Sequence, residues 1–170
     1  MRKIVLYSLA SVLLATSNLA ASIGLAYAKG DDNSKNITTF VSYDIFGGVN
    51  LRLEYNRNLS KYKEFFSTKI NRYGLFATYT QALGNYFSIT PKVGIVKTDG
   101  DFQTLNTLKT ISDSSTDFTY GVELNYDLNS ALSIFAGYTD YGHKFKKIKD
   151  IKASKINSKN ISIGLKLNFF

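Results

Sequence analysis

The sequence predicts an all-β protein: one eight-stranded antiparallel up-and-down transmembrane β-barrel that follows a cleavable export signal. Three observations lead to this prediction. Apolar residues recur at every second position in eight separate segments, which is the period of a β-strand. The 12 Tyr and 12 Phe residues are spread along the chain, whereas Trp and Cys are absent. Short and long connections alternate between the segments, which is typical of bacterial outer-membrane barrels.

The first element is a predicted signal peptide over residues 1–17, with an amphipathic N-terminal helix as the alternative. Arg2 and Lys3 precede an apolar run that is shorter than the roughly 20 residues of a membrane-spanning helix. Small residues allow cleavage after Ser17 or after Ala28. We expect the earlier site, with residues 18–170 as the barrel domain, because the later site would leave seven strands and these barrels close with even numbers.

The strands are predicted from alternation alone. In the clearest segment, residues 49–56, Val, Leu, Leu and Tyr alternate with Asn, Arg, Glu and Asn, so one face is apolar and the other is polar. The eight predicted strands are residues 23–28, 39–45, 49–56, 72–79, 87–95, 118–126, 132–139 and 161–169. Pro91 lies inside the fifth strand and has no N–H to donate, so we expect a β-bulge there, near the periplasmic rim.

The connections predict the orientation of the barrel. Gly, Asn and Ser residues make tight turns at 46–48, 82–85 and 127–130. The long connections lie near residues 29–37, 57–69, 98–114 and 141–159. Outer-membrane barrels keep short turns in the periplasm and long loops outside, so we expect periplasmic termini and four extracellular loops.

A soluble barrel with its apolar face inward would show the same alternation and is the main structural alternative. Lipid on the apolar face is favoured because aromatic residues of that face gather at two levels, as membrane interfaces select. Glycines on the polar face also suit a narrow lumen. The two aromatic levels are Tyr43, Tyr79, Phe87, Tyr126 and Phe169 near the short turns, and Tyr27, Tyr55, Tyr73, Phe118 and Tyr138 near the loops.

The end of the chain resembles the C-terminal signal by which outer-membrane barrels are recognised for assembly. Gly164 is followed by the apolar Leu167 and the aromatic Phe169. Phe170 follows this aromatic residue, which normally ends the signal. The resemblance implies the barrel-assembly machinery as a partner.

Six charged residues are predicted to point into the lumen, and three are basic and three acidic. They are Asp44, Arg52, Glu54, Lys92, Glu123 and Lys166. An eight-stranded lumen is only wide enough for side chains, and buried charges persist when they are paired. We therefore expect a plugged lumen, with Arg52 paired with Glu54 or Glu123, and keep a narrow porin as the alternative.

The fourth long loop is strongly basic, with seven lysines and one aspartate in the 18 residues 142–159. The lysines are Lys144, Lys146, Lys147, Lys149, Lys152, Lys155 and Lys159. A cationic rim attracts polyanions, such as lipopolysaccharide phosphates, sulfated host glycans or acidic surface proteins. The alternative is a solvated loop that neutralises nearby lipid phosphates. Nucleic acid is not an expected partner of an exported barrel.

Residues 21–27, 118–124 and 163–169 resemble the corresponding segments of small outer-membrane proteins of the OmpX/Ail type and of the related opacity-like, porin-family barrels. The resemblance extends over the whole mature chain. It implies a monomeric surface protein whose loops carry interaction functions such as adhesion and virulence. A purely structural role in the outer membrane is the alternative.

Catalysis is a further alternative, because eight-stranded barrels that remodel lipid A are similar to this chain in size. A Ser-His-acid hydrolase needs a histidine to activate its serine. The only histidine, His143, lies at the base of a predicted loop and lacks the His-x-Ser-Asn pattern of lipid A deacylases. We therefore predict a protein that is not an enzyme and that has no metal or cofactor.

Overall fold

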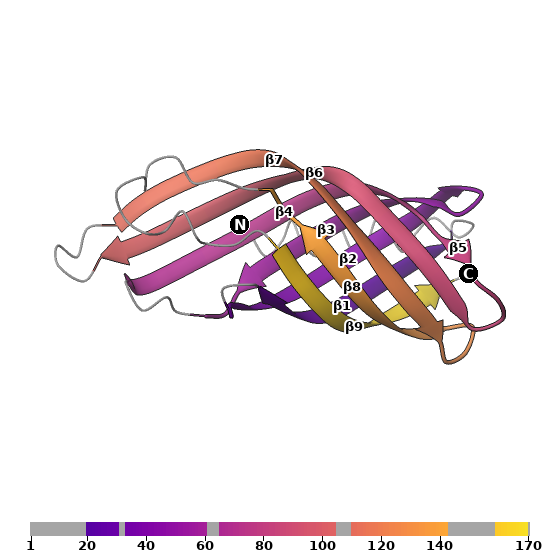
Figure 1. Ribbon diagram of the computed structural model, residues 1–170. Helices are drawn as coiled ribbons and strands as arrows, with labels where there is room; N and C mark the ends of the chain where they lie inside the picture. The colour runs from indigo at the N-terminus through magenta and orange to yellow at the C-terminus, as the bar shows by residue number, and fades with distance from the viewer. Residues whose placement is uncertain (1–19, 31–32, 61–64, 105–109, 143–158, 170) are drawn as a thin grey trace.

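The computed structural model describes residues 20–30, 33–60, 65–104, 110–142 and 159–169, and every regular element in these ranges is a β-strand (Figure 1). The strands are β1 (Ala21–Gly30), β2 (Lys35–Phe46), β3 (Val49–Asn58), β4 (Phe65–Tyr79), β5 (Gln81–Ala82), β6 (Phe87–Thr104), β7 (Thr110–Asp127), β8 (Leu132–Asp140) and β9 (Lys159–Phe169). None of the described residues forms a helix long and apolar enough to cross a membrane.

The sheet closes into a barrel. All neighbouring strands are antiparallel, β1 pairs with β9, and β4 pairs with β6. The two-residue strand β5 pairs with β6 in the register that β4 uses, so β4 and β5 form one interrupted strand of the wall. The predicted eight-stranded antiparallel barrel is therefore confirmed.

The bulge predicted at Pro91 is wrong. Pairing of β4 with β6 ends at Thr78 opposite Lys92 and resumes in β5 at Gln81 opposite Ile89, with no change of register. Pro91 lies opposite this gap, where no ladder hydrogen bond is required of it, and stays in register with β7 on its other side. At this end of the barrel, the irregular register is instead in β2, between Asp44 and Phe46.

Two of the loops predicted from the sequence are mostly strand. The segments predicted as loops 57–69 and 98–114 contain the start of β4, the end of β6 and the start of β7. These parts form a three-stranded extension beyond the rest of the barrel (Figure 1). Their pairs are largely polar, such as Thr98 opposite Ser115. Backbone hydrogen bonds between strands do not require alternating apolar side chains. The alternation in the sequence therefore stops before the strands themselves end.

The barrel has two different ends. The short turns after β2, β5 and β7 lie at one end, together with Ala21 and Phe169, which are paired. We call this the turn end. The opposite end, where β4, β6 and β7 extend, is the loop end. Gly47 and Gly48 have φ values of 56° and 85°, and this left-handed backbone explains the glycine pair in the first turn.

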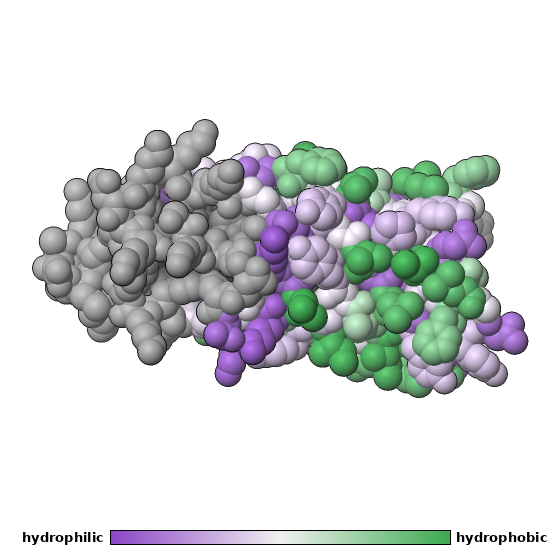
Figure 2. Space-filling model, in the orientation of Figure 1, coloured by the Kyte–Doolittle hydropathy of each residue, from purple (hydrophilic) through white to green (hydrophobic). Residues whose placement is uncertain are grey.

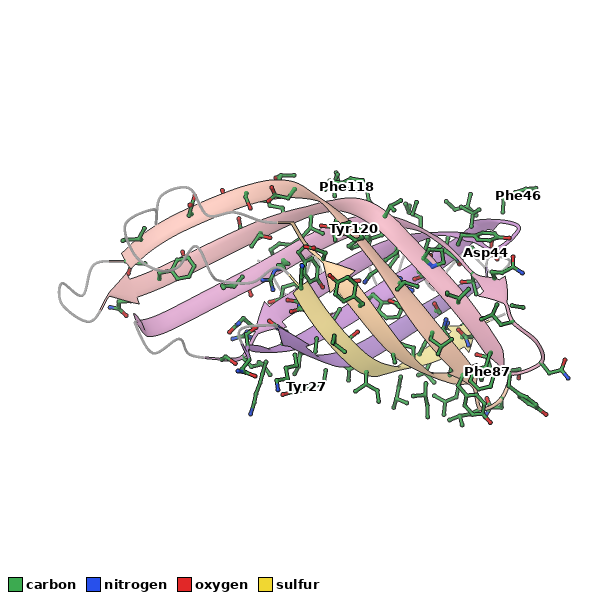
Figure 3. The ribbon with its side chains drawn as sticks, in the orientation of Figure 1. Tyr27, Asp44, Phe46, Phe87, Phe118 and Tyr120 are labelled. Carbon is green, nitrogen blue, oxygen red and sulfur yellow. The ribbon has the colours of Figure 1, made fainter. Side chains whose placement is uncertain are left out.

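The apolar side chains point outward and the polar ones inward. Leu25 is 56% exposed, whereas Arg52 is 2% exposed. Figure 2 shows the outward apolar residues as a band next to a hydrophilic zone on the loop-end side. In Figure 3, Tyr27, Phe118 and Tyr120 lie on the loop-end side of this band and Phe87 lies near the turn end. A soluble barrel has its apolar side chains inside and its polar side chains outside, which is the opposite arrangement. The soluble-barrel alternative is therefore rejected.

Three phenylalanines fill the lumen, and each lies opposite a glycine on a neighbouring strand. Phe40 is opposite Gly24, Phe76 is opposite Gly94, and Phe135 is opposite Gly164. A Cβ atom at Gly24 would lie 2.1 Å from the Phe40 ring. The inward glycines have no side chain, and the phenylalanine rings occupy the space that is left. The interior of the barrel is therefore packed.

Candidate functional site

The waist of the lumen holds four of the six predicted inward charges in one network. Both terminal nitrogens of Arg52 on β3 bind the carboxylate of Glu123 on β7, across β4 and β6, and the Nη2–Oε2 distance is 3.0 Å. Lys92 Nζ lies 2.8 Å from Glu54 Oε2 and 3.7 Å from Glu123 Oε1. The two cations and two anions form a charge-balanced group, which we call the waist network.

Neighbouring side chains complete the hydrogen bonds of the waist network. The Tyr141 hydroxyl donates to Glu54 Oε1 at 2.8 Å, and Arg52 Nε donates to Ser42 Oγ at 2.9 Å. The Arg52 guanidinium also lies 3.9 Å from the centroid of the Phe40 ring. A buried ion pair is tolerated when the remaining donors and acceptors are satisfied, and these contacts meet that condition.

Two residues of this region were missed by the sequence analysis. Arg72 is buried, donates to Asn56 Oδ1 at 2.8 Å and lies over the Tyr141 ring at 4.9 Å. Arg72 lies on the polar face of the predicted segment 72–79, and this position indicated an inward side chain. It was not included among the lumen charges because it is the first residue of that segment. Tyr141 follows β8, in a segment that was predicted to be an extracellular loop, and its pattern gave no sign that the ring turns inward.

The lumen has little free space on the side of the waist network that Tyr141 covers. The cavity that Glu54, Lys92, Glu123 and Tyr141 border has a volume of about 10 Å³. This is near the minimum that one water molecule occupies. The waist network and the inward rings therefore leave little space in this part of the lumen.

The other two predicted lumen charges lie nearer the turn end. Lys166 is 9% exposed, and its ammonium donates to Asn125 Oδ1 at 3.2 Å. Asp44 is half-buried and forms no ion pair with any described residue. Both residues line a polar cavity of about 320 Å³ at the turn-end mouth of the barrel, with Arg52.

Basic residues gather on the outer surface at the loop end, on four neighbouring strands. We call Lys29, Lys35, Arg57 and Lys159 the basic rim, and all four are exposed. Lys29 on β1 stands directly opposite Lys35 on β2. The rim begins two residues beyond Tyr27, which is about 7 Å along an extended strand.

The predicted basic loop lies mostly outside the described residues. This applies to His143 and to Lys144, Lys146, Lys147, Lys149, Lys152 and Lys155. Lys159 is the first residue of β9 and belongs to the basic rim. Within the described ranges, no group of three or more His, Asp or Glu side chains is arranged to hold a metal ion.

The residues of the predicted assembly signal lie on both faces of β9. Leu167 and Phe169 point outward and are 48% and 44% exposed. Gly164 faces the lumen, where a Cβ atom would meet the Phe135 ring at 2.6 Å. Phe170 lies outside the described residues. Recognition of this strand by an assembly machinery remains a prediction.

The sequence matches a protein family and the fold matches solved structures. The family described as outer membrane protein beta-barrel domain matches residues 7–169. A search of curated proteins gives no match. The N-terminal β-barrel domain of Pseudomonas aeruginosa OprF is similar to this chain with a TM-score of 0.68, 15% identity, and coverage of 88% of this chain and 97% of that domain.

Two further solved structures have a similar fold. Neisserial surface protein A gives a TM-score of 0.57 at 15% identity, with 89% of this chain and 96% of that protein covered. Ail of Yersinia pestis, in complex with the heparin analogue sucrose octasulfate, gives 0.52 at 15% identity, with 89% and 96% covered. At these identities the likeness shows a shared fold.

Replacing Glu123 with Gln should destabilise the barrel strongly, because Arg52 would keep its buried charge and lose its carboxylate partner. Breaking a buried pair costs about 3–5 kcal/mol. The measurement is the free energy of unfolding in urea, in detergent micelles or liposomes. The matched control is Asp99→Asn, which breaks the exposed Lys97–Asp99 pair, at 3.6 Å, and should cost less than about 1 kcal/mol. Equal costs for the two variants would contradict the structural role of the waist network.

Proposed function

The chain belongs to the outer membrane protein β-barrel family, and from this premise we propose that it is a closed surface platform that binds polyanions through basic side chains at its loop end. The protein is an outer-membrane barrel of the type that includes Ail, NspA and the OprF N-terminal domain. The proposal concerns what such a barrel does at its surface. No catalytic step is part of it.

The single observation that carries the proposal is the Lys29–Lys35 pair of the basic rim. The two ammonium groups stand on directly opposed residues of the same outward face. Like charges at opposed positions of a sheet destabilise it, because their Cβ atoms lie only about 5 Å apart. An anionic group that contacts both lysines removes this repulsion. Arg57 on the flanking strand β3 adds to the same positive field, whereas Lys159 on β9 stands opposite Asp140.

The position of the basic rim suits phosphate or sulfate groups. It lies just beyond the aromatic level that contains Tyr27, where the headgroup region of a membrane is expected. Lipopolysaccharide phosphates are the nearest such groups, and sulfated glycans of a host surface are a second source of the same chemistry. The six lysines at 144–155 would extend this surface outward. Ail, whose fold is similar, has been crystallised with a heparin analogue.

The closed lumen supports a platform in preference to a pore. The waist network places paired charges across the barrel, and the cavity between Glu54, Glu123 and Tyr141 is only about 10 Å³. A narrow porin needs a continuous water path, and the paired charges at the waist argue against one. With the lumen closed, the outer surface and the ends of the barrel are the parts that can meet a partner.

The orientation and the export signal are parts of the same proposal. The turn end faces the periplasm and the loop end faces outward, as short turns and long loops do in this class of barrel. Residues 1–17 direct export. Support for the earlier cleavage site comes from β1, which begins at Ala21 and joins β2 to β9. Cleavage after Ala28 would remove most of that strand.

Replacing Lys29 and Lys35 with Gln should weaken binding to heparin by about fivefold for each lysine, if each contributes about 1 kcal/mol near an anionic surface. The measurement is the affinity for immobilised heparin at low ionic strength, repeated with cells that express the protein. Replacing Lys146, Lys147, Lys149 and Lys152 with Gln tests the loop in the same assay. Both losses should shrink as salt rises.

The matched control for the rim is the double variant Lys69→Gln and Lys97→Gln, which removes the same charge from β4 and β6. Lys97 pairs with Asp99, and Lys69 stands opposite Asp101, so these lysines do not form an unopposed cationic pair. Equal losses in the rim and control variants would show a response to net charge alone. Unchanged binding in the rim and loop variants at low salt would overturn the proposal.

The mature protein in the outer membrane should begin at Asn18. N-terminal sequencing of the protein from outer-membrane fractions measures this directly. A start at Lys29 would mean that β1 is removed and would contradict the eight-stranded mature barrel. Uncleaved protein in that fraction would contradict a removable signal peptide.

A further inference from the structure

The turn-end mouth of the barrel contains a polar cavity that the proposed function does not use. Its volume of about 320 Å³ is at the small end of the range for ligand pockets, about 300–1,000 Å³. The floor is formed by Arg52, whose guanidinium is already bound to Glu123. Hydroxyl and amide side chains, including Ser42, Asn50 and Asn168, line the walls.

One cation in this cavity has less than its full set of partners. Lys166 is 9% exposed and has three N–H donors, but it makes one hydrogen bond, to the amide oxygen of Asn125. No described carboxylate forms an ion pair with it, and Glu123 and Asp127 attract it only from beyond ion-pair distance. A buried ammonium without a carboxylate in direct contact is costly, so this position favours a ligand that brings a negative group.

Two acidic residues of the same cavity exclude a simple anion. Asp44 and Asp127 both line it, and the Asp44 carboxylate makes no hydrogen bond or ion pair with any described residue. Asp127 accepts a hydrogen bond from Ser133 Oγ at 2.6 Å. Asp44 lies at the turn end of the barrel (Figure 3). A free anion beside Lys166 would be repelled by these carboxylates, whereas a ligand with an added ammonium would be attracted.

We propose that the turn-end cavity binds a small zwitterionic solute, the size of a free amino acid, with its carboxylate at Lys166 and its ammonium at Asp44 and Asp127. Lys166 then meets the carboxylate of the solute, and the two aspartates meet its ammonium. Hydroxyl and amide groups of the cavity complete the hydrogen bonds. The waist network stops the solute at the floor, so the cavity is a binding site and not the entrance of a pathway. In the orientation proposed above, it opens to the periplasm.

The test is a titration of isotope-labelled full barrel, refolded in lipid nanodiscs, with L-alanine, while amide chemical shifts are followed by NMR. Acetate and ethylammonium supply the carboxylate and the ammonium separately, and inorganic phosphate tests for an adventitious ion only. L-alanine should produce saturable shifts at lining residues such as Asn50 and Asn168. Acetate and ethylammonium should each bind at least about tenfold more weakly than L-alanine, because acetate meets only Lys166 and ethylammonium meets only the two aspartates.

Asp44→Asn is the deciding variant, because Asp44 holds no ion pair whose loss would unfold the barrel. It should weaken L-alanine binding about tenfold, and Lys166→Met should abolish it where the variant folds. Asp99→Asn at the loop end is the control and should bind L-alanine as the unaltered protein does. Absence of saturable shifts, an unchanged affinity in Asp44→Asn, or equal binding of phosphate would each overturn the inference. Heparin binding at the loop end is read separately, so the two proposals fail independently.

Discussion

A narrow barrel with lipid outside must keep its polar groups satisfied inside, and the rest of this structure depends on that constraint. Lipid provides no hydrogen bonds, so the backbone is paired all the way around the wall. The lumen then has to hold the inward side chains at close packing. The Arg52–Glu123 ion pair joins β3 to β7 across the lumen and so pairs two buried charges. Lys92, Glu54 and Tyr141 add the remaining ion pair and hydrogen bond. The glycines opposite the three inward phenylalanines leave room for rings beside the charges.

The same constraint separates the wall of the protein from its ends. Wall residues are fixed by lipid on one side and by packing on the other, and they explain why the barrel lies in a membrane. With a closed waist, as we propose, recognition would take place at the loop end and the turn end. These ends differ in character: the loop end carries the basic rim, with Lys29 and Lys35 opposed, whereas the turn end holds a cavity with charges of both signs. The two proposed sites therefore call for ligands of different charge.

The sequence was sufficient for the strand count because an apolar residue at every second position indicates a β-strand, and eight such segments count the strands directly. The two levels of aromatic residues then favoured lipid on the apolar face. Strand ends were harder to predict. The extensions of β4, β6 and β7 are held by backbone pairing of polar residues, which leaves no alternation to read. The bulge expected at Pro91 was wrong because a gap between β4 and β5 already accommodates the missing donor.

Within the lumen, periodicity identified which charges point inward but not how they pair. The sequence left Arg52 with two candidate partners, Glu54 and Glu123, and the barrel curvature brings it to Glu123 while Lys92 takes Glu54. Arg72 was on the correct face of its segment but at a boundary. Tyr141 lies beyond the end of β8, where strand periodicity no longer applies. Pairing and boundary residues depend on three-dimensional distances that a one-dimensional pattern does not contain.

The central claim is that the waist network closes the lumen, and single-channel recording of the purified protein in a planar lipid bilayer tests it most directly. The account predicts a silent bilayer, with no steady current steps across the voltages that the membrane withstands. Steady, uniform open channels from the unaltered protein would contradict it.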